Sequence, residues 1–205
     1  MGVFPAMLEM TGRSAVVVGG GKVGLRKLHS LLDAGAIVTL IAPDEPRGTV
    51  PDEVRIIAEE YQRKHLRGAW LVFACTDDHE LNARIAADAR KMGALINAAD
   101  QPADCDFYLA ATHREGELLI AVSTTGSSPG LAGKLKRQIA AALPERIGEY
   151  TALLRQLRRH IQQVEDDPQV RMTVMKQLSR DENYRLFLTA GPEAVKARAE
   201  ELLKG

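Results

Sequence analysis

The sequence predicts an α/β fold built on a doubly wound parallel sheet, followed by a smaller helical region. Three observations predict it. Short apolar stretches alternate with amphipathic helical stretches from residue 14 to residue 98. The short stretches are continuously apolar, as in strands that are buried on both faces. A glycine-rich turn joins the first apolar stretch directly to the first helical one.

Each element of this first region has its own sequence signal. Residues 3–8 form an apolar piece that a turn at 11–13 separates from the first strand. Gly35 stops the first helix, and Asp77 with Asp78 provides the N-cap of a later one. Strands are expected at residues 14–18, 36–42, 54–58, 70–75 and 94–98. Helices are expected at residues 22–34, 61–67 and 80–92.

The pattern changes after residue 100. Two apolar runs, 106–111 and 118–123, are joined by residues 112–117 with no helix between them. They are therefore expected to form an antiparallel hairpin. A polar loop at 124–130 then leads into a helix at 131–143.

The last region is typical of a small helical domain. A helix of about twenty residues begins near Ile147 and carries an apolar stripe at intervals of three and four. The stripe consists of Ile147, Tyr150, Leu154, Leu157, Ile161 and Val164. Pro168 and the Gly191-Pro192 pair divide the remainder into two further helices.

The glycine-rich turn has the spacing of a dinucleotide-binding motif. Gly19-x-Gly21-x-x-Gly24 follows a strand and opens a helix, which is the context that the motif needs. Gly19 lets the chain turn tightly, Gly21 leaves room for a pyrophosphate, and Gly24 lets the helix pack closely on the strand. Asp44, twenty residues beyond Gly24, follows the second strand and can accept hydrogen bonds from an adenosine ribose. The motif predicts a Rossmann-like domain with a dinucleotide site, and a phosphate-free turn is the alternative.

Ligands of doubly wound folds bind at the carboxyl ends of the strands, where further polar residues occur. Thr76 and Asn97 could hydrogen-bond a cofactor there, with capping or turn roles equally open. Asp100 is the acid directly after the fifth strand, where it would face a nicotinamide. It is either a catalytic group or an Asx-turn residue that opens the loop at Gln101-Pro102.

Composition and charge exclude several function classes. Of 205 residues, 45% are hydrophobic and 26% are charged, and the formal net charge of zero argues against a dedicated nucleic-acid binder. Residues 131–160 nevertheless carry seven Lys or Arg against two acids, which is either a solvated helix face or an anion-binding surface. No apolar run approaches the roughly 20 residues of a membrane helix, and residues 1–10 lack the features of a secretory signal.

The cysteines and histidines predict no metal site. Cys75 and Cys105 lie far apart without CxxC spacing, so reduced thiols in a cytoplasmic protein are expected. The five histidines have no metal-ligand spacing. His113 is expected to be a solvent-exposed loop residue.

Four segments follow one another in a distinctive order and spacing. They are 17–24 (VVGGGKVG), 97–100 (NAAD), 107–111 (FYLAA) and 120–129 (IAVSTTGSSP). Together they resemble the precorrin-2 dehydrogenase family, which is the dehydrogenase and ferrochelatase module of siroheme synthase. The resemblance spans essentially the whole chain, although Ala110-Ala111 stands where family members commonly have Pro-Ala or Pro-Ser.

The resemblance implies oxidation of precorrin-2 to sirohydrochlorin with NAD as the hydride acceptor. It leaves open whether the chain also inserts ferrous iron. The aspartate of the family's Asn-x-x-Asp motif, the proposed catalytic group, is Asp100 here. The resemblance adds Lys22, Val23, Pro43 and Asp44 as cofactor contacts, and Ser123, Thr124 and Ser128 as substrate-loop positions. Asp44 should favour NAD over NADP, because a 2′-phosphate would meet a carboxylate.

The resemblance also implies a Rossmann domain, a central dimerisation element and a helical tail. They are expected at residues 1–112, 113–145 and 146–205. A homodimer is expected on physical grounds too, since an isolated two-stranded hairpin is marginal in water and leaves its edges open to pairing.

Two other function classes stay open. A redox-sensing NAD-binding module without catalysis would keep the glycine turn but has no need of Asp100 or the serine-rich loop. A dehydrogenase of a smaller substrate would have no need of the basic excess at 131–160. Precorrin-2, in contrast, is a flexible polycarboxylate macrocycle, which suits cationic groups and hydroxyl donors.

Overall fold

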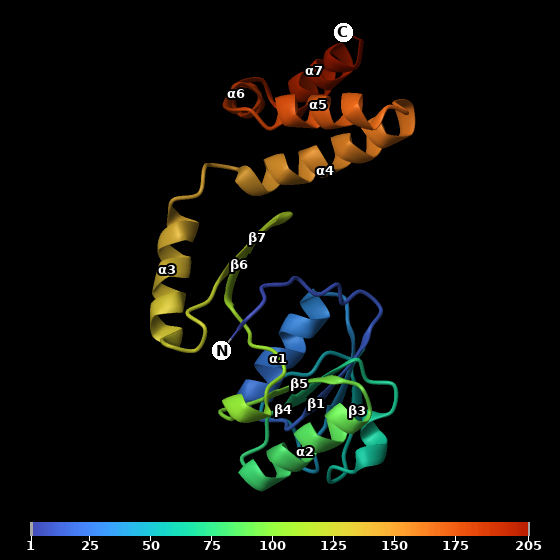
Figure 1. Ribbon diagram of the computed structural model, residues 1–205, viewed down its shortest axis with the longest axis vertical. Helices are drawn as coiled ribbons and strands as arrows, with labels where there is room; N and C mark the ends of the chain where they lie inside the picture. The colour runs from blue at the N-terminus through green and yellow to red at the C-terminus, as the bar shows by residue number, and fades with distance from the viewer. Residues whose placement is uncertain (1, 205) are drawn as a thin grey trace. The chain divides into compact units, whose positions relative to one another are not determined.

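The computed structural model describes residues 2–204, which fall into two compact units, Met1–Tyr108 and Leu109–Gly205 (Figure 1). Each unit has a hydrophobic core of its own. Within residues 2–204, no helix is long and apolar enough to cross a membrane.

The first unit is a parallel sheet with helices on both faces, as the sequence predicted. Its strands are β1 (Ser14–Val18), β2 (Ile37–Ile41), β3 (Arg55–Ile57), β4 (Leu71–Ala74) and β5 (Leu95–Ala98). Their order is β3-β2-β1-β4-β5, so the winding reverses between β1 and β4. The helices α1 (Lys22–Asp33) and α2 (His79–Lys91) lie on opposite faces of the sheet (Figure 1). Short 3-10 turns occupy η1 (Arg63–Leu66) and η2 (Pro102–Asp104).

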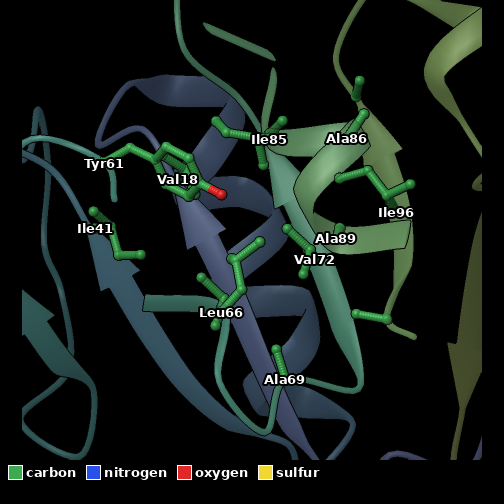
Figure 2. Packing of buried hydrophobic residues seen from close by; sticks show 14 residues of the cluster. Val18, Ile41, Tyr61, Leu66, Ala69, Val72, Ile85, Ala86, Ala89 and Ile96 are labelled. Carbon is green, nitrogen blue, oxygen red and sulfur yellow. The ribbon is translucent and has the colours of Figure 1, made fainter. Parts of the chain in front are cut away.

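Successive side chains of β1 point to opposite faces of the sheet, so they pack into two separate core clusters. Val16 and Val18 belong to the cluster on the α2 side, together with Ile85 of that helix (Figure 2). Ala15 and Val17 belong to the cluster on the α1 side. Because both faces of the strand are covered, every position after the first is buried, which explains the continuous apolar run.

One of the two predicted cap residues of α2 caps the helix in the structure. Asp78 caps α2, because its Oδ1 accepts hydrogen bonds from Glu80 N at 2.9 Å and Leu81 N at 3.0 Å. Asp77, the other predicted cap residue, is exposed. The apolar piece at 3–8 takes no regular structure.

The second unit begins with a hairpin whose first strand lies later in the chain than predicted. Its strands are β6 (Ala111–Glu115) and β7 (Leu118–Val122), paired antiparallel. The strand predicted at 106–111 is wrong, because Asp106 is held to β5 instead: its N–H donates to Ile96 O at 2.8 Å. Gly116, at φ +56°, makes the tight turn, so β6 continues through polar residues that the sequence analysis had assigned to the connection. His113 is therefore half-buried in a strand, not exposed in a loop.

The remainder of the second unit is helical. Its helices are α3 (Pro129–Ala141), α4 (Ile147–Val164), α5 (Pro168–Leu178), α6 (Asp181–Ala190) and α7 (Pro192–Lys204). The prediction of one helix between Pro168 and Gly191 is wrong, since α5 and α6 lie there. Buried Asn183 of α6 donates to Gln177 O at 2.9 Å and satisfies a carbonyl left free where α5 ends. Val164, predicted in the apolar stripe of α4, is 57% exposed because it lies in the last turn, past the bundle core.

A close contact between glycines joins the hairpin to α4. A Cβ on Gly148 would lie 2.8 Å from Glu115 Cγ and 3.0 Å from Gly116 N, so the second residue of α4 has no room for a side chain. Glu115 Oε1 also accepts a hydrogen bond from Gly148 N at 3.3 Å. An ion pair between Glu117 and Arg155 of α4 adds to this junction. The hairpin and the start of α4 are thus packed together.

We expect Gly148→Ala to lower the free energy of unfolding of the second unit by about 2 kcal/mol, because a Cβ forces the hairpin turn away from α4. Gly130→Ala is the matched control. A Cβ at this α3 position meets nothing within 4 Å, so stability should hold or rise by up to about 1 kcal/mol. Thermal unfolding of both variants measures the difference. Equal midpoints would contradict a close-packed junction.

Candidate active site

The glycine turn brings three segments of backbone into direct contact. Gly19 has φ +110°, and its N–H donates to Ile41 O at 2.9 Å, which holds the end of β1 to the end of β2. A Cβ on Gly19 would lie 2.5 Å from Cys75 O, just after β4. A Cβ on Gly24 would overlap the carbonyl oxygen of Gly19, so α1 packs directly onto the turn. The fold itself therefore requires glycine at both positions.

Gly21 differs from the other two motif glycines because open space surrounds it. A Cβ there would meet no atom within 4 Å, and its φ of −77° with ψ of 176° suits any residue. Gly21 is the N-cap residue of α1, and within residues 2–204 no side chain caps that helix. The first N–H groups of α1, including those of Lys22 and Val23, are left for an anion. These residues fit a bound pyrophosphate.

A cavity of about 540 Å³ opens beside this turn, on the α2 side of the sheet. Three predicted cofactor residues line it, Gly19, Pro43 and Thr76. Asp44, the predicted ribose acceptor, is exposed next to Pro43. A volume of this size suits the adenosine half of a dinucleotide.

Several other residues of that cavity were not predicted from the sequence. Glu60, Tyr61 and Arg84 line it as well. The hydroxyl of Tyr61 donates to Asp88 Oδ2 at 3.1 Å, and burial, aided by that carboxylate, raises the pKa of Tyr61, so the hydroxyl stays protonated. No motif marked these positions, because the segment after β3 is brought beside the glycine turn only by the folding of the sheet.

Thr76 and Asn97 are committed to hydrogen bonds within the protein. Thr76 Oγ1 donates to Asn82 Oδ1 at 2.8 Å, and Asn82 Nδ2 donates to Thr76 O at 3.0 Å, which fastens the end of β4 to α2. The buried side chain of Asn97 donates to Phe107 O at 2.9 Å and holds the segment after η2 against β5. Both side chains thus help to shape the carboxyl edge of the sheet.

Asp100 lies exposed at that edge, two residues beyond β5. Ala99 N donates to Ala74 O at 2.8 Å, which continues the β4–β5 ladder and brings Asp100 beside Cys75. Its φ of +59° is left-handed, a conformation that costs a non-glycine residue free energy and clusters at functional sites. Burial raises the pKa of the Cys75 thiol to about 11, and the carboxylate of Asp100 acts in the same direction. Cys75 therefore stays protonated at neutral pH.

The predicted substrate-loop residues gather in one loop of the second unit. Ser123 Oγ accepts a hydrogen bond from Thr125 N at 3.1 Å, and Thr124 Oγ1 accepts one from Ser128 N at 3.0 Å. Ser128 is the N-cap of α3, where its Oγ accepts from Leu131 N at 3.2 Å. In all three cases the oxygen is an acceptor, so each hydroxyl hydrogen is left to donate to a ligand such as a carboxylate.

Comparison with protein families matches both units of the chain. Residues 6–111 match an NAD(P)-binding family, and residues 115–142 match the family of the sirohaem biosynthesis protein central region. The siroheme synthase of Methylococcus capsulatus is 36% identical over 175 residues, which are 83% of this chain and 37% of that protein. The siroheme synthase of Ectopseudomonas mendocina is 32% identical over 212 residues, covering 100% of this chain and 45% of that protein. The chain thus spans about two fifths of the length of these relatives.

A solved structure is similar over nearly the full length of the chain. It is that of SirC, precorrin-2 dehydrogenase, with a TM-score of 0.75 and 25% sequence identity. The likeness covers 97% of this chain and 100% of that chain. It includes both compact units, in contrast to the family models, which match them separately.

Replacement by alanine should affect the close-packed Gly24 and the open Gly21 differently. Gly24→Ala should lower the free energy of unfolding by about 3 kcal/mol, because its Cβ overlaps the Gly19 carbonyl oxygen. Gly21→Ala should unfold like the wild type but bind NAD about tenfold more weakly, since its Cβ occupies the space left for the pyrophosphate. Thermal unfolding and NAD titration measure the two effects. Unchanged NAD affinity in a folded Gly21→Ala variant would contradict the assignment of the pyrophosphate to this turn.

Proposed function

Since this chain belongs to a family of NAD(P)-binding proteins related to siroheme synthase, we propose that it oxidises precorrin-2 to sirohydrochlorin with NAD as the hydride acceptor. The likeness to SirC, precorrin-2 dehydrogenase, carries this proposal, because it covers 97% of this chain and all of that chain. The open glycine turn and the acid at the sheet edge support it independently. The two free cysteines, Cys75 and Cys105, accord with the proposed cytoplasmic location.

The cofactor residues of the proposal surround the start of α1. The uncapped N–H groups at Lys22 and Val23 hold the pyrophosphate, with Gly21 leaving the space for it. Pro43 lines the adenosine cavity, and the carboxylate of Asp44, the next residue, favours the ribose hydroxyls of NAD over a 2′-phosphate. NAD, when bound, supplies the hydride acceptor.

Asp100 is the base of the proposed reaction. Oxidation removes two hydrogens from the substrate, one as a hydride that goes to the nicotinamide and one as a proton. An exposed carboxylate at the end of β5 is free to accept that proton. Iron insertion, with ferrous iron as a second substrate, would also need a base for the pyrrole protons, and Asp100 is our candidate there too.

The proposed substrate carries carboxylates, which bind hydroxyl donors and cationic side chains. The hydroxyls of Ser123, Thr124 and Ser128 have hydrogens left to donate. The basic excess of residues 131–160 supplies cations in the same unit. A polycarboxylate macrocycle can use both kinds of donor.

The proposal is tested by incubating the purified chain with precorrin-2 and NAD while sirohydrochlorin absorbance is followed. We expect turnover with NAD and weaker use of NADP. Asp100→Asn should fold and bind NAD normally but turn over about 10²-fold more slowly, because the amide cannot take the proton. In a separate experiment, ferrous iron is added to the sirohydrochlorin product to test whether the chain also inserts iron. A wild-type chain that binds NAD without turnover would favour the redox-sensing alternative.

We further propose that the chain is a homodimer formed through residues 113–145. The helix α3 exposes Leu131, Leu135 and Ile139, which are spaced by four and share one face. They are 47%, 37% and 42% exposed, respectively. A second copy would cover this stripe and the edges of the β6–β7 hairpin in a closed twofold arrangement.

Sedimentation at micromolar concentration tests the dimer. The wild type should sediment at twice the 22.4 kDa chain mass, and Leu135→Glu should sediment as a monomer. Arg137→Gln is the control, because it also makes the charge more negative by one but lies on another face of α3. A wild type that stays a fully active monomer would contradict the proposal.

A further inference from the structure

Lys27 is a half-buried cation on the inner flank of α1. Its Nζ lies 5.7 Å from the ring centroid of Phe73 in β4, and that ring packs edge-on against Phe107 at 5.6 Å. Burial lowers the pKa of Lys27, as expected for an ammonium group that gives up part of its hydration. Removing a charge from water is unfavourable unless a partner compensates for it.

No carboxylate of the described residues 2–204 lies within 4.0 Å of Lys27 Nζ. Other lysines that are more accessible do have such partners, for example Lys64 with Glu59 and Lys196 with Glu193. Lys27, although half-buried, therefore has no carboxylate partner among residues 2–204. A charged group held in this way is a candidate for binding a charged ligand.

The position of Lys27 points to the ligand. Phe73 and Cys75 belong to the core cluster on the α1 side of the sheet, and Cys75 is the neighbour of Asp100 at the carboxyl edge. The adenosine cavity lies on the α2 side, where Tyr61 belongs to the opposite cluster. Lys27 thus lies on the side of the edge that the adenosine half of the cofactor leaves open. The titratable groups that act on Lys27 are Cys75, Arg26 on the same helix and Cys105, and Asp100 in turn acts on Cys75.

We propose that Lys27 binds a carboxylate of the tetrapyrrole substrate on the α1 side of the sheet edge and so orients the macrocycle toward Asp100. This inference rests on the proposed function, because it takes the ligand to be a polycarboxylate macrocycle. The contact is made to a side chain of the ring, away from the hydrogens that are removed. Lys27 therefore contributes to binding and orientation, not to proton transfer.

The test compares Lys27→Met with wild type. Loss of one charge-assisted contact should raise KM for precorrin-2 about tenfold or more while kcat stays within about threefold. The thermal midpoint should not fall, since the variant removes an uncompensated charge. Lys27→Arg should recover much of the affinity, and Lys27→Gln serves if the methionine variant does not fold. Lys91→Met, at the opposite end of the sheet on α2, is the control and should leave KM unchanged.

Equilibrium binding separates this inference from the proposed function. Uroporphyrin I, an octacarboxylate macrocycle, is titrated by fluorescence, and its Kd should weaken about tenfold in Lys27→Met but not in Lys91→Met. A wild type without turnover would overturn the proposed function, while this titration would still decide the role of Lys27. Unchanged uroporphyrin affinity in Lys27→Met would overturn the inference. A selective loss of NAD affinity would overturn it as well, by assigning the ammonium to the cofactor phosphates.

Discussion

The direct contact of backbone with backbone at the glycine turn is the constraint on which the rest of the first unit depends. Gly24 of α1 touches Gly19 of the turn, and Gly19 touches the backbone at Cys75. With no side chains between them, the start of α1 and the ends of β1 and β4 meet at one point. This meeting point places uncapped N–H groups of a helix at the edge of the sheet where the strand order reverses.

The two faces of that edge present different chemistry. On the α2 side a cavity of about 540 Å³ suits a nucleoside, and hydrogen bonds around Thr76 fix the start of α2 beside it. On the α1 side the neighbours are aromatic rings, a protonated thiol and the ammonium of Lys27, which lies over the Phe73 ring. Asp100 lies at the edge itself, in a left-handed conformation directly after the last hydrogen bond of the β4–β5 ladder. In the proposed reaction, cofactor and substrate approach this one carboxylate from two sides.

Direct backbone packing at glycines also occurs in the second unit, where it joins the hairpin to α4. Gly148 and the turn at Gly116 pack backbone against backbone, which fastens the hairpin to α4 without any side chain between them. The adjoining loop uses its hydroxyl oxygens to hold its own backbone and to cap α3. A loop organised in this way keeps its hydroxyl hydrogens free to donate, and the proposed substrate would bind it with little further ordering.

The sequence by itself determined the parallel sheet and the glycine turn, because strand burial and glycine spacing are local signals. It misplaced β6, since the hydrogen bond from Asp106 to Ile96 that ends the preceding segment joins residues apart in the chain. It left the roles of Thr76 and Asn97 open, because their hydrogen-bond partners are known only from the folded chain. Lys27 looked like one more position of an amphipathic helix. Only the tertiary structure decided that its ammonium is half-buried with no carboxylate of residues 2–204 within 4.0 Å, because that depends on what the sheet and helix place around it.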